Sequence, residues 1–294
     1  MGDLNDLLEG FVDTHIHAGP DLSPREFESW DLVQHAKEHN FKAVVVKNHY
    51  MPSMGYTRVI QDHYPDSNIR IFGSLVLNNS VGGLNPQAVE RAIHFGAKLF
   101  WLPTISAAHH HKKHKAAGFP KQKPAPRVKD TPIECLDTNG RLTSSLEEVL
   151  SVLSDHPDVV LATGHVSPQE VNAVVHRAKE LGIQRIIITH PLFLVGAGMG
   201  ELKDWAKLGA YVEFTAINSF PESMLYTLPP AKIAEVIKTV GADSIIISSD
   251  AGFKDNGWPF ENVGKVLELL SAEGIADDDL RKLVADNPAK LLGV

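Results

Sequence analysis

Eight short runs of β-branched and other apolar residues alternate with longer amphipathic segments along the whole chain. Each run is typical of a buried strand, and each longer segment has the periodicity of a helix. The expected strands cover residues 10–14, 43–46, 69–77, 98–102, 159–162, 185–189, 210–214 and 244–248, with helices expected, among others, at 32–40, 86–95, 146–155, 168–181 and 231–240. Strands that are separated by helices pair in parallel through right-handed crossovers. Eight such units in 294 residues predict an α/β fold, a distorted (β/α)8 TIM barrel that forms one domain over residues 1–294.

The alternative fold is an open, doubly wound sheet. It fits less well, because no glycine-rich phosphate-binding turn follows the first expected strand. The helix ends agree with the alternating units. Gly96, Gly182, Gly209 and Gly241 each follow the last apolar residue of a helical segment, where a left-handed cap is common.

One connection is much longer than the others. Between residues 104 and 143 the chain carries the run HHHKKHK at 109–115, several prolines, and a four-residue turn at 137–140 between the short stretches 133–136 and 141–143. We interpret this segment as an elaborated loop with a small hairpin after the fourth strand. The histidine–lysine run is interpreted as a solvated, mobile loop, and a basic lid that recruits an acidic substrate is the alternative.

Composition excludes several classes of protein. Lys plus Arg number 28 and Asp plus Glu number 36, and a net charge of −8 argues against nucleic acid or an anionic membrane as the partner. The single cysteine, Cys135, excludes an internal disulfide and a cysteine-based zinc site. No basic, apolar leader and no membrane-length apolar run is visible. We therefore expect a cytoplasmic protein that acts on a small molecule; barrels of this sort often pair as homo-oligomers.

Five metal-competent side chains stand where expected strands end. His15 and His17 are two residues apart, so both point to one face of an extended chain. His165, His190 and Asp250 follow the fifth, sixth and eighth expected strands. In a barrel these ends meet at one mouth. Imidazoles with a carboxylate suit zinc, or another divalent metal of similar preference.

This order of histidines and aspartate resembles that of the amidohydrolase superfamily. The C-terminal stretch 286–293, DNPAKLLG, is similar to the Asn-Pro-Ala-x-x-x-Gly ending of that superfamily, and the resemblance extends from Phe11 to Gly293. It implies that the four histidines are metal ligands or lie close to the metal. It also implies that Asp250 binds metal and acts as the general base toward metal-bound water, with a protonated His190 as a stabiliser of oxyanion charge.

The sequence departs from the superfamily at the fourth strand, where binuclear members usually carry a bridging carboxylated lysine or a glutamate. Here that strand ends LFWLPT. Lys47, which follows the second strand, is expected to enter the barrel mouth, where burial near a cation would lower its pKa. Lys47 would then be carboxylated and bridge two metals, act as an acid–base group, or pair with a rim carboxylate such as Asp13 or Asp250. One and two metal ions both stay open.

Substrate contacts are expected from the same rims. His49 shares a face with Lys47, Asn78 follows the third strand, and Trp101 and Thr104 end the fourth. Simple turn chemistry is the alternative for the asparagine. Six further histidines are expected to be ordinary surface residues: His35, His39, His63, His94, His156 and His176.

These features predict an amidohydrolase-type, metal-dependent hydrolase. It would use metal-activated hydroxide on an amide, lactam, cyclic imide, ester or similar bond of a small molecule. A phosphoester hydrolase or a non-oxidative decarboxylase on the same barrel is the second hypothesis. A barrel that binds metal or ligand without chemistry is the third, and Asp250 argues against it because a pure binding site needs no base there.

Overall fold

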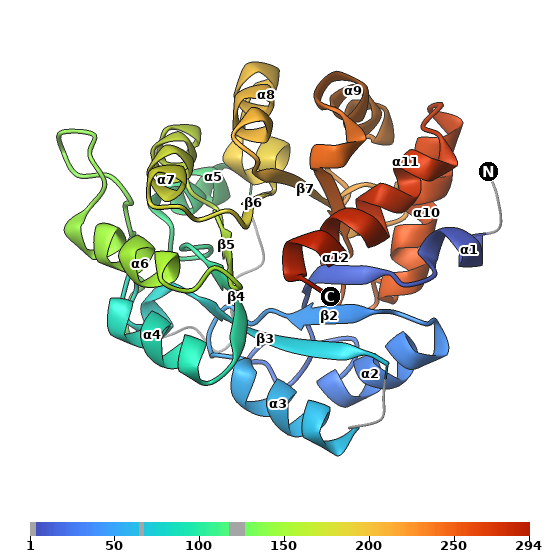
Figure 1. Ribbon diagram of the computed structural model, residues 1–294, viewed down its shortest axis with the longest axis horizontal. Helices are drawn as coiled ribbons and strands as arrows, with labels where there is room; N and C mark the ends of the chain where they lie inside the picture. The colour runs from blue at the N-terminus through green and yellow to red at the C-terminus, as the bar shows by residue number, and fades with distance from the viewer. Residues whose placement is uncertain (1–3, 65–67, 118–126) are drawn as a thin grey trace.

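The structure, a computed structural model, describes residues 4–64, 68–117 and 127–294. Its strands follow one another in chain order around a single sheet, and all the paired neighbours from β1 to β8 are parallel (Figure 1). They are β1 (Val12–Ile16), β2 (Ala43–Val46), β3 (Arg70–Val76), β4 (Ala97–Trp101), β5 (Val160–Ala162), β6 (Ile186–Thr189), β7 (Tyr211–Thr215) and β8 (Ile245–Ser248). Each predicted strand is present, which confirms the (β/α)8 barrel.

Helices fill the connections and surround the strands (Figure 1). They are α1 (Leu4–Leu8), α2 (Ser29–Glu38), α3 (Met54–His63), α4 (Pro86–His94), α5 (Ala108–Ala117), α6 (Ser144–Ser154), α7 (Pro168–Glu180), α8 (Met199–Lys207), α9 (Pro230–Val240), α10 (Pro259–Ala272), α11 (Asp277–Arg281) and α12 (Asn287–Leu292). Short turns of 3-10 type lie at Asn79–Val81, Ala216–Asn218 and Ala242–Ser244, and π-type turns lie at Pro191–Val195 and Lys282–Asp286. Among the described residues, no helix is long and apolar enough to cross a membrane.

The apolar core has two layers. Side chains inside the barrel form one cluster, and the opposite strand faces pack with the helices in a second, larger cluster. On β2, Ala43 and Val45 belong to the inner cluster, whereas Val44 and Val46 belong to the outer one. Because strand side chains alternate between faces, this pattern places the next residue, Lys47, inside the barrel mouth.

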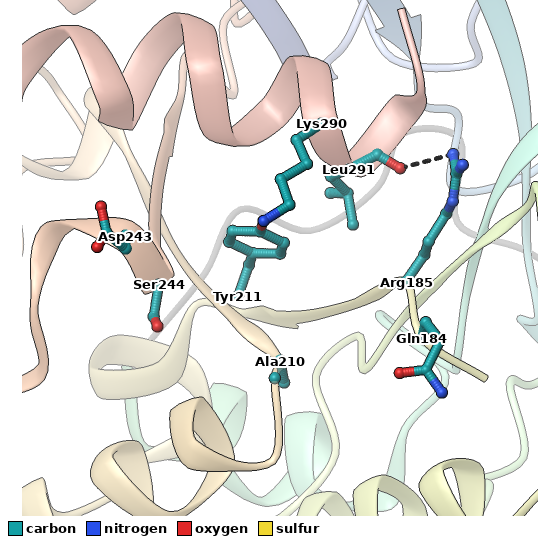
Figure 2. Close-up of a pocket in the computed structure, with 9 residues that line it drawn as sticks. Gln184, Arg185, Ala210, Tyr211, Asp243, Ser244, Lys290 and Leu291 are labelled. Atoms are coloured by element: carbon teal, nitrogen blue, oxygen red, sulfur yellow. Dashed lines mark hydrogen bonds between the residues drawn. The ribbon is translucent and has the colours of Figure 1, made fainter. Parts of the chain in front are cut away.

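The C-terminal helix α12 closes the amino end of the barrel. Leu291 and Leu292 join the inner cluster, and the Asn287 amide donates hydrogen bonds to Ala242 O (2.8 Å) and Ile245 O (2.7 Å). Arg185 Nη1 donates to Leu291 O at 2.9 Å, beside a pocket at this end of the barrel (Figure 2). This end of a (β/α)8 barrel serves stability, and catalytic groups gather at the other. The Asn-Pro-Ala ending of the sequence therefore closes the amino end of the barrel and stabilises it.

The long connection after β4 contains the expected hairpin. Leu136 and Leu142 form an antiparallel bridge, and Asp137 N donates to Arg141 O at 2.7 Å. Cys135 is buried beside this hairpin, and burial raises the pKa of its thiol, so it packs as a small apolar residue. Residues 109–115 lie within α5, so the histidine–lysine run is helical and does not form the expected loop. The segment 118–126 and the side chains of His114 and Lys115 lie outside the described residues.

The barrel closes between β8 and β1 with hydrogen bonds at the carboxyl rim. Asp250 N donates to His15 O at 2.7 Å, and His17 N donates to Ala251 O at 2.8 Å. Gly252 continues this seam with a φ of +113°, and a Cβ atom on it would lie 1.6 Å from His17 O. The seam therefore needs glycine at this position.

Replacing Gly252 with Ala is expected to lower the free energy of unfolding by several kcal/mol. The positive φ costs about 1–2 kcal/mol for a residue with a Cβ atom, and the forced shift costs about 1–3 kcal/mol more. Urea denaturation measures the change. Gly55→Ala in α3 is the control, since nothing lies within 4 Å of its Cβ position, and it should stabilise the protein by about 0.5–1 kcal/mol. Equal effects of the two substitutions would contradict the tight seam.

Candidate metal centre

Three buried ligand groups converge at the carboxyl mouth of the barrel. Asp250 Oδ1 lies 3.2 Å from His15 Nε2 and 3.2 Å from His17 Nε2. One ligand atom from each of the three residues lies within 4.8 Å of the others. The two histidines come from β1 and its end, and Asp250 follows β8, so the site straddles the closing seam.

A glutamate contacts the Nδ1 atom of the His15 ring. The register of β1 shifts between Asp13 and Ile16, and both Thr14 and His15 reach Glu213 on β7. Thr14 Oγ1 donates to Glu213 Oε1 at 3.1 Å, and His15 Nδ1 lies 3.2 Å from Glu213 Oε2. A carboxylate on Nδ1 fixes the tautomer that leaves Nε2 free for a metal.

Burial alone would raise the pKa of the Glu213 carboxyl. The His15 ring and a hydrogen bond from Ser248 outweigh that effect and hold this pKa below its usual value. Burial would also raise the pKa of Asp250. Its neighbours His15, His17 and His190 outweigh that effect, and the pKa of Asp250 lies well below the usual range. Both groups are therefore anionic and offset the cationic character of the mouth.

His190 contacts the second oxygen of Asp250. Its Nε2 lies 3.5 Å from Asp250 Oδ2, and its ring centroid lies 5.2 Å from that of His15. Burial lowers the pKa of His190 to about 4 although Asp250 opposes the shift, so the ring is neutral near pH 7. Neutral imidazole is the form that binds metals. The resemblance described above implied a protonated His190 instead.

Two ligand positions have strained backbones. His190 has a φ of +46° and Asp250 a φ of +51°, in the left-handed region that favours glycine. Such a conformation costs about 1–3 kcal/mol and persists only where surrounding structure enforces it. Both residues stand one or two positions past the end of a strand. The surrounding structure therefore enforces an unfavourable backbone conformation at both rim positions.

His165 approaches the centre but is not one of the three clustered ligands. Its ring centroid lies 5.4 Å from that of His190, and its buried Nε2 atom has no hydrogen-bond partner among the described residues. The preceding Gly164 has a φ of +64° and lies so close to β4 that a Cβ would be 2.4 Å from Leu102 O. A buried imidazole nitrogen without a hydrogen-bond partner, in a ring close to that of His190, is consistent with a metal site.

The histidine-rich helix α5 contributes to this mouth, which the interpretation as a mobile loop missed. His110 is buried, and its Nδ1 lies 2.9 Å from His165 Nδ1, with the two rings stacked at 4.8 Å. His109 Nε2 lies 3.0 Å from the carbonyl oxygens of Leu194 and Val195, in the π-type turn after His190. Helix α5 therefore packs over the site and orients His165.

Lys47 lies inside the mouth, as the alternation along β2 predicts. It is 1% exposed, its Nζ lies 2.9 Å from His15 Nε2, and its ammonium stands 5.1 Å from the Trp101 ring centroid. Burial lowers the pKa of Lys47 to about 8, although Asp250 and Glu213 oppose the shift. The structure thus brings Lys47 against the candidate ligands; its carboxylation stays a prediction.

The residues predicted to bind substrate form one wall of the mouth. Thr104 Oγ1 lies 2.8 Å from His49 Nδ1 and accepts a hydrogen bond of 2.8 Å from the Asn78 amide. Asn78 Oδ1 in turn accepts from Thr104 N and Ser106 N, so this amide holds the loops after β3 and β4 together. The His49 ring lies 4.8 Å from that of His17, and the Trp101 ring lies 5.6 Å from that of His15. Their contact with a substrate stays a prediction.

Arg25 is a further side chain at the mouth that the sequence did not single out. It donates two hydrogen bonds to Asp21 Oδ2 (2.9 and 2.7 Å), and its Nη2 lies 3.4 Å from His17 Nδ1. Burial, followed by this guanidinium, holds the pKa of His17 well below its usual value. Burial and Arg25 together therefore favour the neutral form of the His17 ring.

Comparison with known families assigns the chain. The sequence profile of a family of unknown function, DUF6282, matches residues 10–213. The chain belongs to DUF6282. The matched region runs from the residues before β1 to Glu213 on β7, so it contains every candidate ligand named here except Asp250. No curated protein sequence is similar enough to this DUF6282 chain to match it.

Solved structures share the fold of this DUF6282 protein. An amidohydrolase from Pseudomonas aeruginosa is 13% identical with a TM-score of 0.62, over 99% of this chain and 97% of that one. A phosphotriesterase homology protein from Escherichia coli, with phosphate in its active site, is 12% identical with a TM-score of 0.60, over 96% and 98%. A lactonase from Listeria monocytogenes is 15% identical with a TM-score of 0.59, over 96% and 94%. The resemblance to amidohydrolase-type barrels is confirmed for the fold.

Proposed function

We propose that this DUF6282 protein is a metal-dependent hydrolase that cleaves an amide, lactam, cyclic imide, ester or similar bond of a small molecule. The observation that carries the proposal is the group of buried ligand atoms from His15, His17 and Asp250, within 4.8 Å of one another at the carboxyl mouth of the barrel. Active sites of (β/α)8 enzymes lie at this mouth. The shared fold with an amidohydrolase and a lactonase supports the proposal.

The residues at the mouth fit a divalent cation. His15, His17 and Asp250 would hold it, with His190 and the unpartnered Nε2 of His165 at hand as further nitrogen ligands. Imidazole and carboxylate donors with no thiolate favour zinc in a catalytic site. A bound divalent cation would polarise the scissile group and lower the pKa of water to about 7. If Lys47 were carboxylated, it would offer a further ligand for a second ion.

The side chains of the protein would complete the chemistry. Asp250 has two oxygens within reach of three histidine nitrogens, and it would accept a proton from the attacking water and return it to the leaving group. Glu213 would hold His15 in its metal-binding tautomer. Trp101 and Lys47 would exclude water from the inner side of the site, because both are 1% exposed.

Phosphoester hydrolysis is the second candidate. Lys47, 2.9 Å from His15 Nε2, would place an ammonium group near the anionic oxygens of a phosphoester. The barrel of the phosphotriesterase homology protein, which holds phosphate in its active site, is consistent with this alternative.

A substrate screen of the zinc-loaded protein tests the proposal. The panel contains amides, cyclic imides, lactones, phosphoesters and carboxylic acids that lose carbon dioxide. We expect turnover of an amide, imide or lactone that requires zinc and is lost in Asp250→Asn. Turnover confined to phosphoesters would select the second candidate. No turnover of any class, with tight ligand binding, would overturn the proposal in favour of a binding protein.

A further inference from the structure

A second group of metal-competent side chains lies outside the barrel, between α2 and α10. His35 and His39 are one helical turn apart at the end of α2, and Glu261 is in the first turn of α10. One ligand atom from each lies within 4.8 Å of the others. Two histidines four residues apart on one helix face are a common way to bind a transition metal.

The inner member of this group is buried without a partner. His35 is 8% exposed, and its Nε2 has no hydrogen-bond partner among the described residues. That nitrogen stands 3.9 Å from Glu261 Oε2, beyond hydrogen-bond distance. An unsatisfied buried polar atom is destabilising, and a bound cation would give this nitrogen a partner.

The two imidazoles are held in place by aromatic neighbours. The His35 ring packs against Trp258 (4.8 Å between centroids) and edge-on against Phe41 (5.8 Å), and the His39 ring stacks on Phe260 at 4.0 Å. Burial, followed by the proximity of His39, lowers the pKa of His35 to about 4, so its ring is neutral near pH 7. Side chains that are already oriented by their neighbours lose little freedom when a metal binds.

We propose that His35, His39 and Glu261 form a zinc site that ties α2 to α10. Ligand atoms of a tetrahedral zinc ion are separated by roughly 3.3 Å, because each lies about 2.0–2.1 Å from the metal. The half-exposed Glu261 side chain can close the 3.9 Å separation from His35 with a small rotation. Three protein ligands leave a fourth position for water, so the site would bind zinc, or a divalent metal of the same preference, reversibly.

The position of this site gives it a structural consequence. Helix α2 follows the loop after His17, and α10 follows the loop after Asp250. These two loops already meet through the Arg25–Phe253 bridge and through the stack of Phe27 on Trp258 (4.6 Å). A metal between α2 and α10 would therefore clamp the outside of the seam whose inner side carries the proposed catalytic ligands.

Nickel and zinc binding to full-length protein test the site without any activity assay, so the outcome is separate from that of the hydrolase proposal. The parent is the His15→Ala/His17→Ala variant, which weakens the central site. Nickel should quench the fluorescence of Trp258, because the ion would sit beside the His35 ring that this indole contacts. Trp258→Phe identifies that signal, and equilibrium dialysis against zinc counts the ions bound.

His39→Ala and Glu261→Gln are the decisive variants, since neither removes a buried side chain. We expect each to weaken the nickel quenching by about tenfold or more and to lower bound zinc by about one ion per chain. Glu268→Gln on α10 and His176→Ala on α7 change exposed side chains and should leave both readouts unaltered. Parental quenching and zinc content in His39→Ala and Glu261→Gln, or no quenching in the parent, would overturn the proposal.

Discussion

Replacing Asp250 with Asn is expected to lower kcat of the zinc-loaded protein by about 10³-fold or more. General acid–base groups contribute about 10²–10⁴-fold, and Asp250 also faces His15, His17 and His190, so its loss would remove a proposed metal ligand as well. Steady-state kinetics on the substrate found in the screen measure the effect. Zinc content and circular dichroism of the variant separate lost chemistry from lost metal or lost fold.

Asp255→Asn is the matched control for that substitution. Asp255 lies in the same loop, also has a positive φ (60°) and is exposed. Its replacement should change kcat by less than about twofold, since surface substitutions have small effects. An Asp250→Asn protein that kept its full rate would remove the proposed base from the mechanism.

Replacing Glu213 with Gln is expected to weaken zinc binding by about 10–100-fold, the usual effect of losing the group behind a metal-binding histidine. Glutamine retains the size of the side chain and can still accept hydrogen bonds from Thr14 and Ser248. It removes the negative charge opposite His15 Nδ1, which fixes the tautomer of that ring. Competition with a chromophoric chelator measures the change in affinity.

Glu222→Gln serves as the control, because Glu222 is exposed after β7 and touches none of the candidate ligands. Its zinc affinity should equal that of the unmodified protein. If Glu213→Gln bound zinc as tightly as this control, Glu213 would have only a packing role.

The fold could be predicted because its signal is local and repeated. Each strand is a short β-branched run, and its bounds in the structure lie within two residues of the predicted ones. The glycines at the helix ends have the positive φ that their positions implied, for example +95° at Gly96 and +84° at Gly182. The closing seam was harder to foresee, since it depends on contacts between β1 and β8, at opposite ends of the barrel sequence.

The candidate site could be predicted in part. His15, His17, His190 and Asp250 converge as expected, because side chains at the carboxyl ends of barrel strands share one mouth. Glu213 was missed, although it is an acid at an inward position between outward-facing Val212 and Phe214, and that pattern is readable in the sequence.

Other errors came from the tertiary contacts. His110 lies in a strongly basic run that suggests a solvated segment, yet the packing of α5 over the mouth buries it against His165. His35 was expected at the surface, but it is buried and packs against Trp258 at the start of α10. Periodicity predicts the face of a helix, but the partner of that face depends on how helices distant in sequence pack together.

An anomalous-scattering map of crystals grown with zinc tests the central claim most directly. The account predicts a zinc peak at the carboxyl mouth, about 2.0–2.2 Å from ligand atoms of His15, His17 and Asp250. Density beyond Nζ of Lys47 would reveal carboxylation of this lysine, and a second anomalous peak would reveal a second ion. A mouth without an anomalous peak, in crystals soaked to saturation with zinc, would contradict the proposed metal centre and the hydrolase chemistry built on it.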